Sequence, residues 1–203
     1  MIRRFAAALA VLFAVLASGQ AAAQTAKTAV AIFAGGCFWC MEQPFDVLPG
    51  VSSTVSGYIG GTKESANYRA VSSGVTGHYE AVKIEYDPAK VSYEKLLSVF
   101  WHNVDPGNST GQFCDTGPQY RTGIFFTDEA QKKEAEVSKA ALAKSGKLPG
   151  PVVTEILPAT EFYPAEDYHQ DYYVKSKAKY EFYRQGCGRD ARLKVIWGAA
   201  AGH

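Results

Sequence analysis

The stretch AVAIFAGGCFWC (residues 29–40) sets how this chain begins to fold. Its first six residues, Ala29–Ala34, are all apolar and predict a short buried strand. The pair Gly35-Gly36 interrupts that strand, and we expect a helical segment over about Cys37–Leu48. A cysteine therefore stands where a strand ends and a helix begins.

The rest of the chain alternates strands and helices. Tyr79–Tyr86 is the clearest strand, because apolar residues alternate there with charged ones. Ser92 and Thr127 are the expected N-caps of two helices, and Gly146 follows the last turn of the longer one. We see no internal repeat and no linker, so we expect one α/β domain with a mixed sheet. Further strands are expected at Val51–Tyr58, Thr122–Phe126 and Val152–Leu157.

Residues 1–23 predict a secretory signal. A basic start at Arg3-Arg4 precedes the apolar run Phe5–Leu16 and the small triplet Ala21–Ala23, where cleavage is expected. The apolar run is shorter than the ~20 residues that span a bilayer. We therefore expect an exported, periplasmic protein without stable membrane insertion, whose folded domain with its C-terminal tail covers residues 24–203. An uncleaved membrane anchor is the alternative.

Composition excludes several classes of protein. The chain has 203 residues, of which 47% are hydrophobic and 20% charged, values that exclude a disordered chain, a collagen-like repeat and a coiled coil. Its 21 basic and 20 acidic residues give a net charge of +1, so no basic surface for nucleic acid is expected. No flavin or nucleotide motif is present, and we expect no cofactor.

Two of the four cysteines form a C-x-x-C motif at Cys37 and Cys40. Helix-terminal amides favour a thiolate, so we expect a lowered pKa and a nucleophile at Cys37, with a buried inert cysteine as the alternative. The motif also fits a dithiol redox pair or half of a zinc site, but no second ligand pair follows at a suitable spacing. Between the cysteines, Phe38 and Trp39 predict either an apolar pocket that suits an S-methyl group or two core side chains.

Five sequence blocks occur in a diagnostic order, although each alone would be a weak signal. They are GGCFWCMEQPFDVLPGV (35–51), GYIGG (57–61), NYRAVSSGVTGHYEAVKIEYDP (67–88), DTGPQYR (115–121) and FYPAEDYHQDYY (162–173). Together they resemble the peptide-methionine sulfoxide reductase A family over nearly the whole mature chain. The resemblance implies an α+β fold, a two-layer sandwich with a ferredoxin-like core. It also implies reduction of methionine-(S)-S-oxide, free or in proteins.

The same resemblance implies a role for each matching residue. Cys37 corresponds to the nucleophile, which attacks the sulfoxide sulfur and becomes a sulfenic acid. Glu80 corresponds to the carboxyl group that protonates the sulfoxide oxygen, which must be protonated before it can leave. The residues that correspond to the substrate-binding set are Phe38, Trp39, Tyr68, Asp115 and Tyr120.

The thiol that resolves the sulfenic acid stays open, because the chain departs from common family members. Cys40 replaces a frequent glycine, Cys187 lies in an extended tail, and Pro118 interrupts a matching block. Cys187 is our first choice because its flanking glycines allow it to move. Cys40 is the second choice: residues three apart on a helix hold Cβ atoms ~5–6 Å apart, whereas a disulfide needs ~3.8 Å. Cys114, beside the matching aspartate, is the third.

Reduction in an exported compartment requires electrons, so we expect a thioredoxin-like, membrane-fed thiol reductant acting on a monomer. A general C-x-x-C dithiol-disulfide oxidoreductase is the alternative enzyme, and a secreted binding domain with two structural disulfides is the non-enzymatic alternative. In the tyrosine-rich segment we expect His169 to be a hydrogen-bonded structural residue, and we expect Glu166 and Asp167 to support the pocket.

Overall fold

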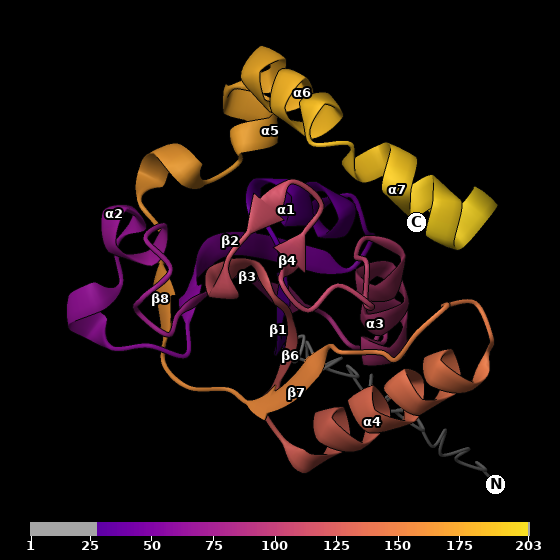
Figure 1. Ribbon diagram of the computed structural model, residues 1–203. Coiled ribbons are helices and arrows are strands. Elements are labelled where there is room, and N and C mark those ends of the chain that lie inside the picture. The colour runs from indigo at the N-terminus through magenta and orange to yellow at the C-terminus, as the bar shows by residue number, and fades with distance from the viewer. Residues whose placement is uncertain (1–27, 203) are drawn as a thin grey trace, which may run out of the picture.

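The computed structural model describes residues 28–202, so the predicted signal at 1–23 lies outside the described residues (Figure 1). Across residues 28–202, none of the helices combines the length and the apolar character that a membrane crossing requires.

A six-stranded sheet organises the domain. Its strand order is β7-β6-β1-β3-β2-β8, and all neighbours are antiparallel except β6 and β7, which run parallel. The expected mixed sheet is therefore confirmed. A separate pair, β4 and β5, forms a short ribbon. The strands are β1 (Ala29–Gly35), β2 (Val51–Ile59), β3 (Tyr79–Tyr86), β4 (Gly111–Gln112), β5 (Asp115–Thr116), β6 (Thr122–Phe126), β7 (Glu155–Pro158) and β8 (Phe162–Pro164).

Helices cover one face of this sheet. The C-terminal helices α5 to α7, orange to yellow in Figure 1, lie on the side of the molecule that carries α1, and α4 lies at the other end of the view. The α-helices are α1 (Trp39–Asp46), α2 (Tyr68–Val71), α3 (Tyr93–His102), α4 (Glu129–Lys144), α5 (Tyr172–Lys175), α6 (Lys177–Gly186) and α7 (Arg189–Trp197). Single turns of 3-10 helix occupy Lys63–Ser65, Pro118–Tyr120, Asp167–His169 and Gly198–Ala200.

The central strand β1 builds the main core. Because side chains alternate along a strand, Ala31 and Phe33 point into the helix-covered core, whereas Ile32 and Ala34 belong to a smaller cluster on the other face. The Phe33 ring is fully buried and stacks on three rings from the helices. Its centroid lies 5.5 Å from Phe45, 6.0 Å from Tyr93 and 5.1 Å from Phe100.

Several expected boundaries differ from the structure, and three of these differences affect a helix start, a cap or a strand start. The first helix begins at Trp39 rather than at Cys37, so the cysteine precedes the helix. The N-cap of α4 is Asp128 rather than Thr127, because the Asp128 carboxylate accepts the Gln131 N–H at 2.8 Å. The strand expected from residue 152 begins at residue 155, since the Val153 N–H donates to the carbonyl oxygen of Pro106 instead of a strand.

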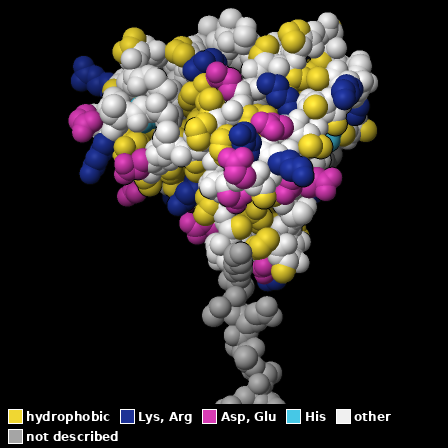
Figure 2. Space-filling view, turned by 90° about the horizontal axis from the view of Figure 1, so that it is seen from below, with side chains coloured by type: hydrophobic (Ala, Val, Ile, Leu, Met, Phe, Trp, Pro, Cys, Tyr) yellow, Lys and Arg dark blue, Asp and Glu magenta, His cyan; other side chains and the backbone are white. Residues whose placement is uncertain are grey.

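The surface agrees with the balanced composition. On the face seen from below, Lys and Arg side chains are interspersed with Asp and Glu side chains, and neither sign forms a continuous area (Figure 2).

Phe33→Ala tests the central role of β1. Removing a fully buried ring leaves a cavity among Phe45, Tyr93 and Phe100, so we expect the free energy of unfolding to fall by about 3–5 kcal/mol in urea titrations. Val137→Ala on α4 is the control: Val137 is 62% exposed, and a change within about 0.5 kcal/mol is expected. A loss below about 1 kcal/mol for Phe33→Ala would contradict this assignment of the core.

Candidate active site

Close packing forms the turn between β1 and α1. A Cβ atom on Gly35 would lie 2.6 Å from the Met41 sulfur, and one on Gly36 would lie 2.6 Å from the Gln112 Cβ. Gly36 also has a φ of +85°, a conformation that side-chain-bearing residues rarely adopt. The turn places Cys37 and Phe38 immediately before α1, with the Cys37 side chain only 6% exposed.

One small cavity of about 60 Å³ opens beside Cys37. This volume suits the end of one side chain, because sites for drug-sized ligands measure about 300–1,000 Å³. All seven residues that the sequence predicts as catalytic or substrate-binding line this cavity, together with Tyr183, which the sequence reasoning did not single out. The lining residues are Cys37, Phe38, Trp39, Tyr68, Glu80, Asp115, Tyr120 and Tyr183.

The sheet buries Glu80. It lies on β3 with the same side-chain parity as Val82 and Ile84, so the strand directs its carboxyl group toward the main core. The Phe38 N–H donates to its Oε2 at 3.1 Å. Burial raises the pKa of Glu80 from 4.5 to about 8, although that hydrogen bond acts in the opposite direction. The carboxyl group therefore retains its proton at neutral pH.

Two tyrosines provide neutral hydroxyl groups in the same cavity. Burial raises the pKa of Tyr68 to about 12 and raises the pKa of Tyr120 further, so both phenols stay protonated. Tyr68 begins the short helix α2, whose N-cap Asn67 accepts the Ala70 N–H at 3.0 Å. The Tyr68 N–H donates to Glu166 at 2.9 Å, which confirms the expected supporting role of Glu166.

Aromatic rings form the wall of the cavity. The Trp39 ring stacks on Tyr172 with a centroid separation of 3.9 Å and an interplanar angle of 10°. Its indole N–H donates to His169 Nδ1 at 2.9 Å, and the His169 ring lies 5.0 Å from Phe38. Burial lowers the pKa of His169, so the ring is neutral and serves as the expected structural acceptor.

Cys37 and Cys40 are both free, buried thiols, and the Cys40 backbone N–H donates to the Cys37 carbonyl oxygen at 3.1 Å. The expectation of a lowered pKa at Cys37 is wrong: burial, reinforced by Cys40 and Glu80, raises the pKa of Cys37. The neighbouring Cys37 side chain, followed by Arg189 and Arg184, instead lowers the pKa of Cys40.

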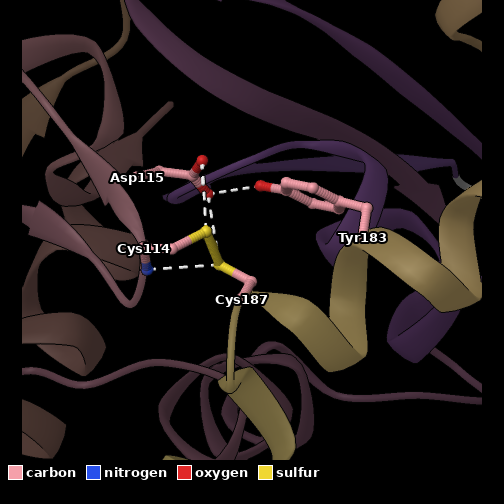
Figure 3. The surroundings of a disulfide bond; sticks show 4 residues. All are labelled: Cys114, Asp115, Tyr183 and Cys187. Atoms are coloured by element: carbon pink, nitrogen blue, oxygen red, sulfur yellow. Dashed lines mark hydrogen bonds between the residues drawn. A yellow bond between two sulfur atoms is a disulfide. The ribbon is translucent and has the colours of Figure 1, made fainter.

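A disulfide joins Cys114 to Cys187 next to Asp115 and Tyr183, as Figure 3 shows, and these last two residues line the cavity. The Asp115 carboxylate is 3.8 Å from the Cys114 sulfur and 4.0 Å from the Cys187 sulfur. It also accepts a 2.5 Å hydrogen bond from the Tyr183 hydroxyl. The possible metal-ligating atoms of Cys114, Asp115 and Cys187 lie within 4.8 Å of one another, but the two sulfur atoms are bonded to each other in the disulfide.

Tyr183 shows what sequence reasoning missed. It lies on α6, in a segment where several tyrosines could equally face the site. Its ring packs edge-on against Trp39, with the two ring centroids 5.7 Å apart. Burial raises the pKa of its hydroxyl group, so it remains a donor to Asp115. Its position four residues before Cys187, on the same side of α6, is the sequence signal that relates it to the site.

Comparisons with known proteins agree with the geometry. The family model described as "Peptide methionine sulfoxide reductase" matches residues 29–201. Peptide methionine sulfoxide reductase MsrA of Halalkalibacterium halodurans is 54% identical over 83% of this chain and 96% of its own length. MsrA 2 of Caulobacter vibrioides is 50% identical over 97% of this chain and 99% of its own. Reduced Mxr1 of Saccharomyces cerevisiae has a TM-score of 0.71 at 30% identity, covering 75% of this chain and 88% of that chain.

Glu80→Gln tests whether the Glu80 carboxyl group is protonated in the folded protein, through the pH dependence of the free energy of unfolding. Between the ordinary pKa of 4.5 and the folded pKa of about 8, the unfolded chain releases a proton that the folded chain keeps. The contribution of Glu80 to the free energy of unfolding is therefore present at low pH and lost as the pH rises through this window. Gln has no such proton and retains an oxygen for the Phe38 N–H.

Urea unfolding of both proteins at pH about 4.5 and about 8 should show the stability of Glu80→Gln growing relative to the unsubstituted protein as the pH rises. Glu85→Gln, a half-exposed carboxylate of the same strand, is the control. A stability difference that does not change with pH would contradict the assignment.

Proposed function

The chain belongs to the peptide methionine sulfoxide reductase family, and from this premise we propose that it reduces methionine-(S)-S-oxide, free or in proteins, through a sulfenic acid on Cys37. As a member of this family it is an oxidoreductase acting on sulfur groups. One observation carries the proposal: a buried thiol and a protonated carboxyl group, Cys37 and Glu80, line the same small apolar-walled cavity.

The cavity offers the proposed substrate two kinds of surface, one apolar and one that donates hydrogen bonds. Phe38 and Trp39 offer apolar ring surface for the S-methyl group, and sulfur makes favourable contacts with aromatic rings. The Tyr68 and Tyr120 hydroxyl groups line the same cavity as Glu80 and remain neutral donors for the sulfoxide oxygen. Glu80 holds a proton at neutral pH, which supports its role as the acid that makes the oxygen a better leaving group.

Geometry favours Cys40 as the thiol that resolves the sulfenic acid. Cys40 is a free thiol whose backbone N–H donates to the Cys37 carbonyl oxygen at 3.1 Å, and because Cys37 precedes α1 the pair is not held at the spacing of a regular helix. Cys187, the first choice from sequence, is joined to Cys114 in this structure. The proposed product of one turnover is therefore a Cys37–Cys40 disulfide, one water molecule and methionine.

A thioredoxin-like protein is the proposed reductant. One structure with a related fold is Mxr1 of Saccharomyces cerevisiae in complex with Trx2. Export through the predicted signal at residues 1–23, with a periplasmic location and a monomeric state, completes the proposal. A general dithiol-disulfide oxidoreductase would use the same two free thiols, but it would have no need of the protonated Glu80.

Mass spectrometry after one equivalent of methionine-(S)-S-oxide tests the reaction. Cys37→Ser should lose methionine formation to background, because it removes the proposed nucleophile. Cys40→Ser should form methionine once per enzyme molecule and retain an added oxygen on Cys37, since the proposed resolving thiol is absent. Cys114→Ser is the control and should still form the Cys37–Cys40 disulfide. Methionine formation by Cys37→Ser would contradict the proposed function, and a Cys37–Cys187 disulfide in Cys40→Ser with full turnover would make Cys187 the resolving thiol.

Cell fractionation with N-terminal sequencing tests export. The mature protein should be released from the periplasm and begin at Gln24, because the small triplet Ala21–Ala23 precedes that residue. A chain with leucine at positions 21–23 should keep its signal and remain with the membrane. An unprocessed natural chain in the cytosolic fraction would contradict the prediction.

A further inference from the structure

Arg189 is a buried cation that forms no ion pair. It is the first residue of α7, and its side chain is only 1% exposed. Within residues 28–202, no carboxylate lies within salt-bridge distance of its guanidinium, and its Nε has no hydrogen-bond partner. A buried charge is costly unless nearby groups compensate it, and an apolar residue of similar size would avoid that cost. The contacts that Arg189 does make therefore indicate its role.

One nitrogen of the guanidinium joins three segments of the chain. Arg189 Nη2 donates to the carbonyl oxygens of Gly35 at 3.0 Å and Asn103 at 2.7 Å, and it lies 2.9 Å from the Met41 sulfur. These three residues belong to the end of β1, the end of α3 and the helix α1. A Cβ atom on Gly36 would lie 3.6 Å from Arg189 Nη1, so the guanidinium packs directly against the turn between β1 and α1.

The same guanidinium also contacts the β4–β5 ribbon. Its carbon atom lies 4.5 Å from the centroid of the Phe113 ring, a geometry in which a cation is attracted to an aromatic face. Phe113 stands between β4 and β5 with a φ of +57°, two residues before Asp115. Asp115 and Cys37 line the same cavity, one from the ribbon and one from the turn. Arg189 therefore contacts both segments that bring these two side chains together.

We propose that Arg189 is a positioning residue for the reduction: its guanidinium holds the turn that carries Cys37 against the ribbon that carries Asp115, and so places the Cys37 sulfur for attack. The inference rests on the proposed function for the identity of the substrate. Nucleophilic attack tolerates little displacement, because a misplacement of about 1 Å can cost about 100-fold in rate. Arg189 is not among the residues that line the described cavity, so it acts through the turn and the ribbon rather than on the substrate.

The chain holds Arg189 firmly in this place. Two residues earlier, Cys187 is bonded to Cys114 of the ribbon (Figure 3), and Gly188 turns the chain into α7 with a φ of +70°. One helical turn later, Leu193 is 1% exposed and packs in the main core. Because the chain is anchored on both sides of Arg189, its guanidinium has a fixed origin from which to position the turn.

Single-turnover kinetics separate positioning from stability. Without added reductant and at saturating methionine-(S)-S-oxide, the amount of methionine formed gives the fraction of active molecules, and the rate constant reports the chemistry. Arg189→Met keeps an unbranched apolar side chain but removes the donors, so it should lower the rate constant by about 10- to 100-fold at nearly full amplitude. Leu193→Ala is the matched control on the same helix: it should lower the stability and leave the rate constant of the folded molecules unchanged.

Phe113→Leu tests the contact with the ribbon and leaves the buried cation in place, so it also serves if Arg189→Met fails to fold. Leucine keeps the apolar bulk but offers no aromatic face to the guanidinium. It should lower the same rate constant in the same direction by a smaller factor. The double variant should be no slower than Arg189→Met alone, because Phe113 acts through the guanidinium that is then absent.

Amide hydrogen exchange gives a readout that does not depend on the reaction. In Arg189→Met, the amides of residues 35–40 should exchange faster than in the unsubstituted protein, including the Phe38 N–H that donates to Glu80. Leu193→Ala should instead raise exchange within α7 and leave residues 35–40 protected.

An unchanged rate constant in Arg189→Met or in Phe113→Leu would overturn the proposal, and so would an equal loss of rate constant in Leu193→Ala. If neither the unsubstituted protein nor its variants reduce the sulfoxide, but Arg189→Met still speeds exchange at residues 35–40, the proposed function is refuted and the hold of Arg189 on the turn remains established.

Discussion

Exclusion of water from one strand-to-helix turn governs the chemistry of this protein. The carboxyl group of Glu80 and the thiol of Cys37 are almost fully buried, and burial is the largest influence on both pKa values. In such a setting a carboxyl group keeps the proton that it would lose in neutral water, and a thiol resists ionisation more strongly than it does in water. The close contacts of Gly35 and Gly36 hold this turn against the core, so packing and acidity are consequences of the same contacts.

The C-terminal segment completes a site that the sheet begins. Strand β3 and the turn before α1 supply Glu80, Cys37 and Phe38, whereas α6 adds Tyr183 from more than a hundred residues away. The Cys114–Cys187 bond joins this segment to the β4–β5 ribbon next to Asp115, and the Tyr183 hydroxyl contacts the same carboxylate. The disulfide therefore fixes the position of the C-terminal segment relative to the cavity.

The predictions of secondary structure that were correct depend on local sequence patterns. The strand over Tyr79–Tyr86 was predicted with its observed bounds, because alternation is a property of the strand alone. The residues of the cavity came from resemblance to a family, and the structure brings all seven of them together. The pKa of Cys37 was predicted to be lowered, whereas burial raises it, because a motif reveals a helix terminus but not the burial around it. Arg189 and the Cys114–Cys187 pairing depend on contacts between distant elements, which no local pattern encodes.

The buried thioether of Met41 has a consequence for the durability of the molecule itself. Met1 and Met41 are the methionines of the sequence, and the second is 1% exposed beneath the Gly35 backbone. Sulfoxidation would add an oxygen atom at a position where even the Cβ of residue 35 would lie only 2.6 Å from this sulfur. The folded domain thus shields its own methionine from the oxidants that create its proposed substrate.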